Sequence, residues 1–345
     1  MAYTTIKKPS DYFNTVLYTG TGAEQSISSL DFSPDLTWIK NRDTIDWHRL
    51  LDSVRGATKE LYSNSANTED TQAQSLKSFD SNGFTLGTLA EVNTSGENYA
   101  SWSWRGSDSS AVSNTDGSIT STVSANTTSG FSIVKFNTSG QSGTMTCGHG
   151  LGAVPKMIIV KPYSVSDSWY TYHVGTGNAQ YIQLESSNAS TSNSNTWAST
   201  SPTSSVFSMS TNFWGANTND IIAYCFAEKK GFSKFGSYTG NGNADGNFVY
   251  LGFKPAWVLV KNSSLSGENW VLLDNKRDID NPTNLALFPN LSDAESGTYP
   301  FDFVSNGFKI RDTSASYNRS GDVFIFMAFA ENPLVGTNNI PATAR

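Results

Sequence analysis

Few residues in this 345-residue chain have the types and spacing that catalysis or metal binding requires. The three histidines, His48, His149 and His173, are far apart and fall in different strand-like segments. No HExxH motif, His/Cys cluster or GxSxG turn accompanies them, so neither a zinc site nor a serine nucleophile is indicated. A glycosidase-type carboxylate pair could come from any two strands and stays open. We predict a protein that is not an enzyme and uses no cofactor or metal.

Two acids stand out because each precedes an arginine by three residues. They are Asp52, before Arg55, and Asp274, before Arg277. A unique active site would occur once, whereas this arrangement occurs twice in similar surroundings. The recurrence favours a structural ion pair or turn over a catalytic role.

The segment Asn241–Gly246, with the sequence Asn-Gly-Asn-Ala-Asp-Gly, resembles the start of a calcium loop. An EF-hand loop needs a glutamate at its twelfth position. Counted from Asn241 that position is Gly252, so the ligand is absent. Asn, Asp and Gly all tolerate positive φ, and we predict a turn.

The elements that position these residues follow a β pattern that occurs three times. Each copy has a proline and a lysine six residues apart around an apolar run: Pro34 and Lys40, Pro155 and Lys161, Pro255 and Lys261. Apolar and aromatic runs alternate with Gly, Asn, Asp and Pro clusters, which is typical of sandwich strands. Asn82-Gly83 and Asn306-Gly307 lie between such runs and predict hairpins. We therefore predict an all-β chain of three tandem, divergent β-sandwich repeats, jelly-roll-like, of about 100 residues each.

The same pattern predicts domain boundaries. The segment between the first two repeats is nearly all small and polar and indicates an extended linker or an edge hairpin. The predicted segments are a docking arm (1–13), repeat 1 (14–106), a Ser/Thr-rich linker (107–129), the divergent repeat 2 (130–231), repeat 3 (232–331) and a C-terminal tail (332–345).

Composition excludes several classes of protein. The net charge is −7 with no extended basic cluster, which argues against nucleic-acid binding. No apolar run reaches the roughly 20 residues of a membrane span, and the N-terminus lacks the apolar stretch of a signal peptide. The two cysteines, Cys147 and Cys225, are interpreted as buried free thiols, with a bridge between them left open.

Tryptophans are the remaining candidates for ligand contact. Trp38 and Trp257 are interpreted as equivalent core residues of repeats 1 and 3. Trp197 and Trp214 have no evident counterparts in the other copies. Aromatic faces stack on sugars and also anchor protein interfaces, so these two are candidates for glycan or interface contact, with burial or interface packing favoured over glycan contact.

Several of these motifs carry a resemblance to a known family. They are Tyr12–Gly20 (YFNTVLYTG), the Pro34–Lys40 strand, Asp52–Gly56, Asn82-Gly83-Phe84 and the ending 339–345 (NIPATAR). The chain resembles an uncharacterised, tail-fibre-like repeat family in virion proteins of tailed phages, especially marine and cyanobacterial ones. The resemblance covers nearly the whole chain and is weakest in repeat 2. It implies a virion role and supplies no catalytic residues.

The resulting expectation is a structural phage virion protein, a tail fibre or spike component that contributes to host adsorption. It would be assembled in the host cytoplasm and dock on other virion proteins of the tail or capsid through its arm or tail. It is expected to form a homo-oligomer, a trimer by analogy with other fibres, and could contact a host surface glycan. A capsid decoration protein or head fibre is the alternative. A polysaccharide depolymerase is disfavoured because such enzymes typically have short β-helix rungs, whereas the period here is about 100 residues.

Overall fold

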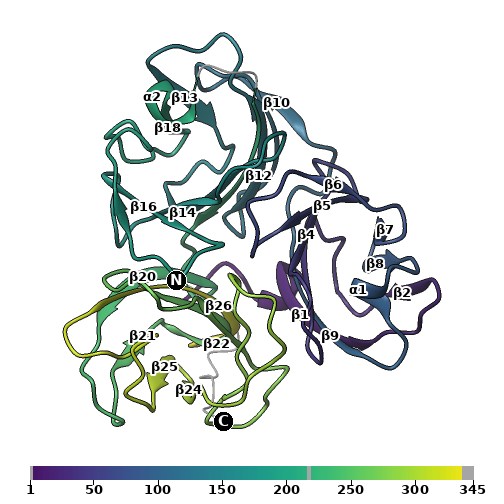
Figure 1. Cartoon of the computed structure of the whole chain (residues 1–345), viewed down its shortest axis with the longest axis vertical. Coiled ribbons are helices and arrows are strands. Elements are labelled where there is room, and N and C mark those ends of the chain that lie inside the picture. Colours follow the sequence, from purple (N-terminus) through teal and green to yellow (C-terminus); the bar gives the residue numbers. More distant parts are fainter. Residues whose placement is uncertain (1–2, 216–218, 336–345) are drawn as a thin grey trace.

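The computed structural model describes residues 3–215 and 219–335 and confirms the all-β prediction. Its strands group into three units around a common centre (Figure 1). The only helices among these residues are single turns: η1 (Pro9–Asp11), α1 (Ala90–Asn93) and α2 (Thr211–Trp214). None of them is long and apolar enough to cross a membrane.

Unit 1 is a two-layer sandwich. Its large sheet has the order β1-β9-β3-β4-β5-β6 and its small sheet the order β2-β8-β7, with an apolar core between them. The strands are β1 (Phe13–Thr19), β2 (Gln25–Ile27), β3 (Leu36–Asn41), β4 (Arg49–Asp52), β5 (Lys59–Tyr62), β6 (Asp70–Thr71), β7 (Leu76–Asp80), β8 (Gly83–Leu86) and β9 (Asn98–Trp104).

Unit 2 has the larger main sheet, in the order β10-β11-β12-β19-β14-β15-β16-β17, and a small sheet of two strands, β13-β18. The strands are β10 (Val112–Asn114), β11 (Ser121–Asn126), β12 (Phe131–Asn137), β13 (Thr144–Gly148), β14 (Pro155–Pro162), β15 (Tyr170–His173), β16 (Gln180–Gln183), β17 (Thr191–Ser192), β18 (Val206–Ser210) and β19 (Asp220–Ala227).

The prediction of a linker at residues 107–129 is wrong. Strands β10 and β11 lie within it and form an antiparallel hairpin, and β11 continues the sheet by pairing with β12. The segment is therefore the edge hairpin that the sequence left as the alternative. A strand needs its backbone groups paired and tolerates small polar side chains at a sheet edge, so composition alone does not distinguish the two.

Unit 3 repeats the plan with a large sheet in the order β20-β26-β22-β23 and a small sheet in the order β21-β25-β24. The strands are β20 (Ser233–Thr239), β21 (Phe248–Tyr250), β22 (Phe253–Asn262), β23 (Val271–Asp274), β24 (Phe301–Val304), β25 (Gly307–Ile310) and β26 (Val323–Pro333).

The three large sheets share one register. In each, the closing strand lies between the opening strand and the Pro–Lys strand, and Lys40, Lys161 and Lys261 lie opposite Ala100, Ile222 and Ile325. This register corrects one expectation. Trp38 lies opposite Trp102, whereas Trp257 lies opposite Phe329, in the place that Leu36 takes opposite Trp104. Both tryptophans are buried, but they are not equivalent. Trp38 lies two residues before Lys40, whereas Trp257 lies four residues before Lys261.

The units meet in a shared aromatic core. Trp104, Phe226 and Phe329 take the same place in the three closing strands. Their ring centroids form a triangle with sides of 6.2, 6.2 and 5.7 Å, and each pair meets edge to face. One continuous buried cluster contains all three rings together with apolar residues from every unit. The chain therefore has an internal, approximate threefold arrangement.

Backbone hydrogen bonds repeat around this centre at equivalent places. In each, an amide of one unit donates to a carbonyl oxygen of another unit. That carbonyl belongs to the residue two positions after the lysine of the Pro–Lys strand. The bonds are Glu69 N to Tyr163 O (2.9 Å), Ser190 N to Ser263 O (3.0 Å) and Glu295 N to Arg42 O (2.9 Å). They run from unit 1 to 2, from 2 to 3 and from 3 to 1, so the ring is closed.

The described part of the predicted docking arm, residues 3–13, packs on the body of the protein. Ile6 is buried in the shared core, and the Tyr3 hydroxyl donates to the carbonyl oxygen of Gly252 at 2.6 Å. These residues are thus part of the fold and not a projecting arm. The predicted tail, 332–345, begins inside β26, and its residues 336–345 lie outside the described residues.

Candidate functional site

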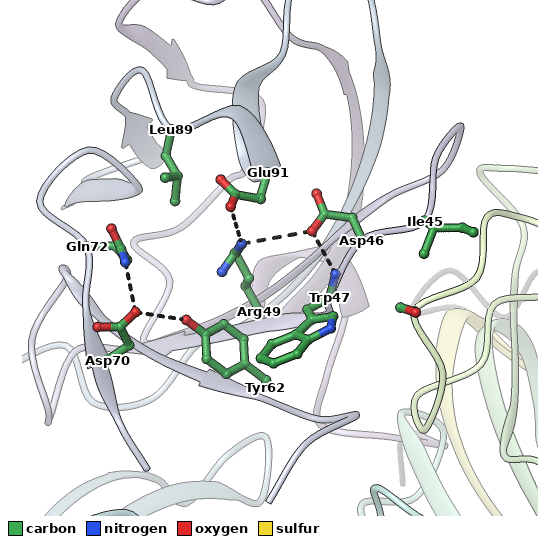
Figure 2. A pocket seen from close by; sticks show the side chains of 10 residues that line it. Ile45, Asp46, Trp47, Arg49, Tyr62, Asp70, Gln72, Leu89 and Glu91 are labelled. Atoms are coloured by element: carbon green, nitrogen blue, oxygen red, sulfur yellow. Dashed lines mark hydrogen bonds and ion pairs between the residues drawn. The ribbon is translucent and has the colours of Figure 1, made fainter. Parts of the chain in front are cut away.

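A polar cavity of about 400 Å³ opens on unit 1 (Figure 2). The loop between β3 and β4, the strands β4, β5 and β6, and helix α1 supply most of its walls, and one residue comes from unit 3. The lining residues are Ile45, Asp46, Trp47, Arg49, Tyr62, Asp70, Gln72, Leu89, Glu91 and Ser292.

Arg49 is the central cation of this cavity. Its Nη1 donates to Glu60 Oε2 at 2.7 Å, and its Nη2 lies 3.5 Å from a carboxylate oxygen of Glu91 and 3.9 Å from one of Asp46. The guanidinium also lies over the Tyr62 ring, 5.3 Å from its centroid. Only 6% of the side chain is exposed, and no described residue accepts a hydrogen bond from Nε. A cation is thus held in the wall with one donor left over.

Burial and Arg49 act in opposite directions on the acids. Burial raises the pKa of Asp46 to about 6, against the attraction of Arg49. Burial likewise raises the pKa of Glu60, again opposed by Arg49. Asp70 behaves differently: hydrogen bonds from Gln72 and from the Thr71 amide lower its pKa. The cavity is therefore bordered by one carboxyl group with a raised pKa, Asp46, and one with a lowered pKa, Asp70.

Trp47 provides an aromatic surface at the cavity. It is 40% exposed, whereas the other eight tryptophans are at most 5% exposed. Its ring meets the Tyr62 ring edge to face at 5.0 Å, which fixes its orientation. Ile45, 77% exposed, extends the apolar surface beside it. The chain thus presents one tryptophan to solvent, and it does so next to a polar cavity.

The equivalent positions of the other units hold no such cavity residues. Strand register places Tyr170 and Val271 where unit 1 has Arg49. It places Tyr181 and Ala286 where unit 1 has Glu60. In unit 2 the rings of Tyr170 and Tyr181 meet edge to face at 5.2 Å, with Phe213 and Trp214 packed on Tyr170. Charge at this position is confined to unit 1.

The recurring Asp/Arg pairs are structural ion pairs, as their recurrence predicts. Arg55 Nε donates to Asp52 and Arg277 Nε donates to Asp274, each at 2.6 Å and each with buried side chains. Each pair also joins two units: the Tyr224 hydroxyl donates to Asp52 at 2.8 Å, and Trp102 Nε1 donates to Asp274 at 2.9 Å.

The third equivalent position is His173, opposite Met157 as Asp52 is opposite Leu36. Its Nε2 lies 3.0 Å from the carbonyl oxygen of Phe326 in unit 3, and burial lowers its pKa to about 4. All three positions therefore connect neighbouring units, and the histidine forms part of an interface.

The Pro–Lys signature is structural as well. Pro34, Pro155 and Pro255 are buried at or near strand entrances, and the three lysine amines donate to backbone carbonyls. Two of the lysines reach another unit: Lys161 donates to Ala66 O at 3.0 Å and Lys261 donates to Ser187 O at 3.1 Å. Burial lowers the pKa of Lys40, Lys161 and Lys261 to about 8.

The predicted hairpins are present, as β7–β8 and β24–β25. Asn82 and Asn306 lie in their turns, and Gly83 and Gly307 begin the return strands. A Cβ at either glycine would collide with the backbone oxygen of Ile27 or Val249 in the adjacent strand, which explains the glycines. The cysteines Cys147 and Cys225 are free and buried in the core of unit 2.

The two tryptophans considered for glycan or interface contact lie in the interior of unit 2. Trp197 and Trp214 are 2% and 5% exposed in the core of unit 2, and their indole nitrogens donate to the carbonyl oxygens of Gln180 and Thr196. Their burial is the interpretation favoured from the sequence, and it leaves no ring face free for a glycan. The residue that sequence reasoning missed is Trp47. An alignment of the repeats could have identified it. The other copies have the polar residues Ser168 and Asn269 at this position, which indicates a side chain that faces solvent.

Fold and site together define an all-β protein of three sandwich units around a shared core, with a polar, aromatic-edged cavity on its first unit. The chain belongs to the family described as a domain of unknown function (DUF7483), whose model matches residues 8–333. That span contains all three units. Neither the curated proteins nor the solved structures gave a match.

Proposed function

We propose that this chain is a structural phage virion protein, a component of a tail fibre or spike that contributes to host adsorption. The observation that carries the proposal is the closed ring of three units around the Trp104, Phe226 and Phe329 triangle. The phage setting comes from the resemblance of the repeat motifs to tail-fibre-like virion proteins.

The ring bears on the expected trimer. Separate chains that form a threefold assembly must bury large apolar surfaces against one another. Here the inner faces of the three large sheets are already buried within one chain. We therefore propose that the chain is the single-chain equivalent of a trimer and is monomeric in solution. A closed β block with threefold geometry suits a place on the axis of a larger particle.

The test is the location of the chain on virions. Antibodies raised against the purified chain are applied to intact particles of a phage that encodes it and viewed by immunogold electron microscopy. Label on the tail supports the proposal. Label on the head rejects the tail assignment in favour of capsid decoration or a head fibre. Absence of the chain from purified particles, checked by mass spectrometry, rejects a virion role.

Light scattering on the same purified chain tests the single-chain trimer. We expect one species near the chain mass of 37.3 kDa. A stable species of three times that mass would contradict this part of the proposal. The apolar sheet faces that would form a threefold interface are already buried within one chain.

A further inference from the structure

We infer that the cavity on unit 1 binds a neutral hexopyranose, stacked on Trp47 and hydrogen-bonded to the polar groups of the cavity wall. The inference goes beyond the proposed function and does not require it, because it concerns a ligand of this one cavity, wherever the chain is located. It assigns a binding role to Trp47, Arg49 and their acidic neighbours.

The first argument is the exposed indole. A tryptophan left in water forgoes the favourable burial of a large apolar surface, and eight of the nine tryptophans in this chain avoid that cost. Trp47 is held in place by its edge-to-face contact with Tyr62. A pyranose ring has one face of C–H groups, which the electron-rich face of an indole attracts. A fixed, exposed indole is thus a suitable platform for a sugar ring.

The second argument is the polar wall around Arg49. Arg49 lines the cavity with only 6% of its side chain exposed, and its Nη2 lies 3.5 Å from a carboxylate oxygen of Glu91 and 3.9 Å from one of Asp46. Both distances are longer than a good N–H···O hydrogen bond. A ligand hydroxyl in the cavity can accept from this Nη2. Hydroxyl groups of a sugar can also donate to Asp70 and Glu91, whose carboxylates face the same space (Figure 2).

The charge balance selects a neutral ligand. Asp46, Asp70 and Glu91 line the cavity with one arginine, so an anionic sugar would meet an excess of carboxylates. A cationic ligand would meet the guanidinium, which lies among those carboxylates and already occupies the aromatic face of Tyr62. Hydroxyl groups both donate and accept, and they suit this mixed wall.

Size agrees with this assignment. The cavity of about 400 Å³ is within the range of about 300–1,000 Å³ that small-molecule sites occupy. Trp47 and Ile45 in its wall are exposed, so a longer glycan could extend past them from the bound ring into solvent.

The experiment uses the full chain and the methyl glycosides of glucose, galactose and mannose as probes, in millimolar titrations followed by saturation-transfer NMR. We expect at least one of them to bind. Trp47→Ala should weaken that binding at least about tenfold. The matched control is Phe248→Ala, since Phe248 is a 46% exposed ring on β21 of unit 3 and should leave binding unchanged.

Three outcomes overturn the inference: no binding of any of these glycosides, equal binding by Trp47→Ala and the parent, or equal loss in Phe248→Ala. Preferred binding of N-acetylneuraminic acid or glucosamine would also overturn it, since either reverses the charge argument. Glu91→Gln, at a side chain that is 43% exposed, gives a second variant whose fold is not at risk and whose affinity should fall. Failure here leaves the virion test unaffected, because that test measures location alone.

Discussion

Where unit 1 buries the ion pair between Arg49 and Glu60, unit 2 packs the rings of Tyr170 and Tyr181 against each other. The two pairs take the same places in the same kind of sheet. Replacing a buried ion pair by well-packed apolar groups is often neutral or stabilising by about 1–4 kcal/mol, because two charges no longer have to be desolvated. Unit 2 therefore demonstrates that the sheet closes without these charges. Their presence in unit 1 calls for a reason other than folding.

The units agree at other positions, and these positions have structural roles. The aromatic triangle, the lysines Lys161 and Lys261, and the positions of Asp52, His173 and Asp274 lie at unit interfaces. Where the three copies are alike in placement, the residues hold the ring together. Where unit 1 alone carries charge and an exposed indole, it forms a cavity. Divergence between copies thus separates residues of the fold from candidates for binding.

The largest effect should come from breaking the ion pair on one side. Glu60→Gln leaves the Arg49 guanidinium buried without its 2.7 Å partner, and we expect a loss of about 3–5 kcal/mol in the free energy of unfolding. Urea unfolding measures it. The control is Glu24→Gln, which removes an exposed ion pair with Lys77 and should cost less than about 1 kcal/mol. A Glu60→Gln chain as stable as the parent would mean that Asp46 and Glu91 suffice for Arg49.

The second effect is a pH dependence that Asp46 should give unit 1. Its folded pKa of about 6 exceeds the ordinary value of 3.8, so the native state binds the proton more tightly than the unfolded state. Stability from this group is therefore full below pH 3.8 and is lost as pH rises through about 6. Partial solvent contact reduces the loss to about 1–2 kcal/mol. The measurement is the free energy of unfolding of the parent and of Asp46→Asn between about pH 4 and about pH 7, a range that includes the folded pKa of about 6. Parallel curves would contradict the prediction.

Much of the fold could be predicted from local sequence, because strand entrances, hairpins and Asp/Arg turns depend on neighbouring residues. Pro34 to Lys40, Asn82-Gly83 and the pair of Asp52 with Arg55 are examples. The closure of the ring could not, since it depends on contacts among sheets that lie far apart in the chain. The strands β10 and β11 stayed undecided between a linker and an edge hairpin, because backbone pairing does not require apolar side chains.

The candidate site was harder to predict because it depends on exposure. Trp197 and Trp214 drew attention as tryptophans without counterparts. Unit 2 has two strands in its small sheet where the other units have three, and these rings fill its core. Trp47 adjoins His48, the counterpart of the core residues Trp169 and Trp270, which obscured it. Only the polar residues at its own position in the other copies indicate an outward-facing side chain.

A third prediction concerns a variant of unit 1 that carries the tyrosine pair of unit 2. The double variant Arg49→Tyr/Glu60→Tyr removes both charges and places two rings where Tyr170 and Tyr181 lie in unit 2. We expect a free energy of unfolding within about 1 kcal/mol of the parent or above it, well above that of Glu60→Gln. Urea unfolding of the three chains decides the matter. A double variant as unstable as Glu60→Gln would show that unit 1 depends on its ion pair for folding.

The smallest effect on stability, and the sharpest contrast between units, concerns Trp47. Trp47→Ser installs the residue that unit 2 has at this position, and we expect a loss of about 1 kcal/mol or less in the free energy of unfolding, since the side chain is 40% exposed and its ring contact is with Tyr62. The control is Trp169→Ala in unit 2, where the indole is buried and donates to the Tyr62 carbonyl at 2.8 Å; its loss should cost about 3–5 kcal/mol. A large loss in Trp47→Ser would make Trp47 a packing residue of unit 1. A near-silent substitution leaves ligand contact as the explanation for an indole that contributes little to folding.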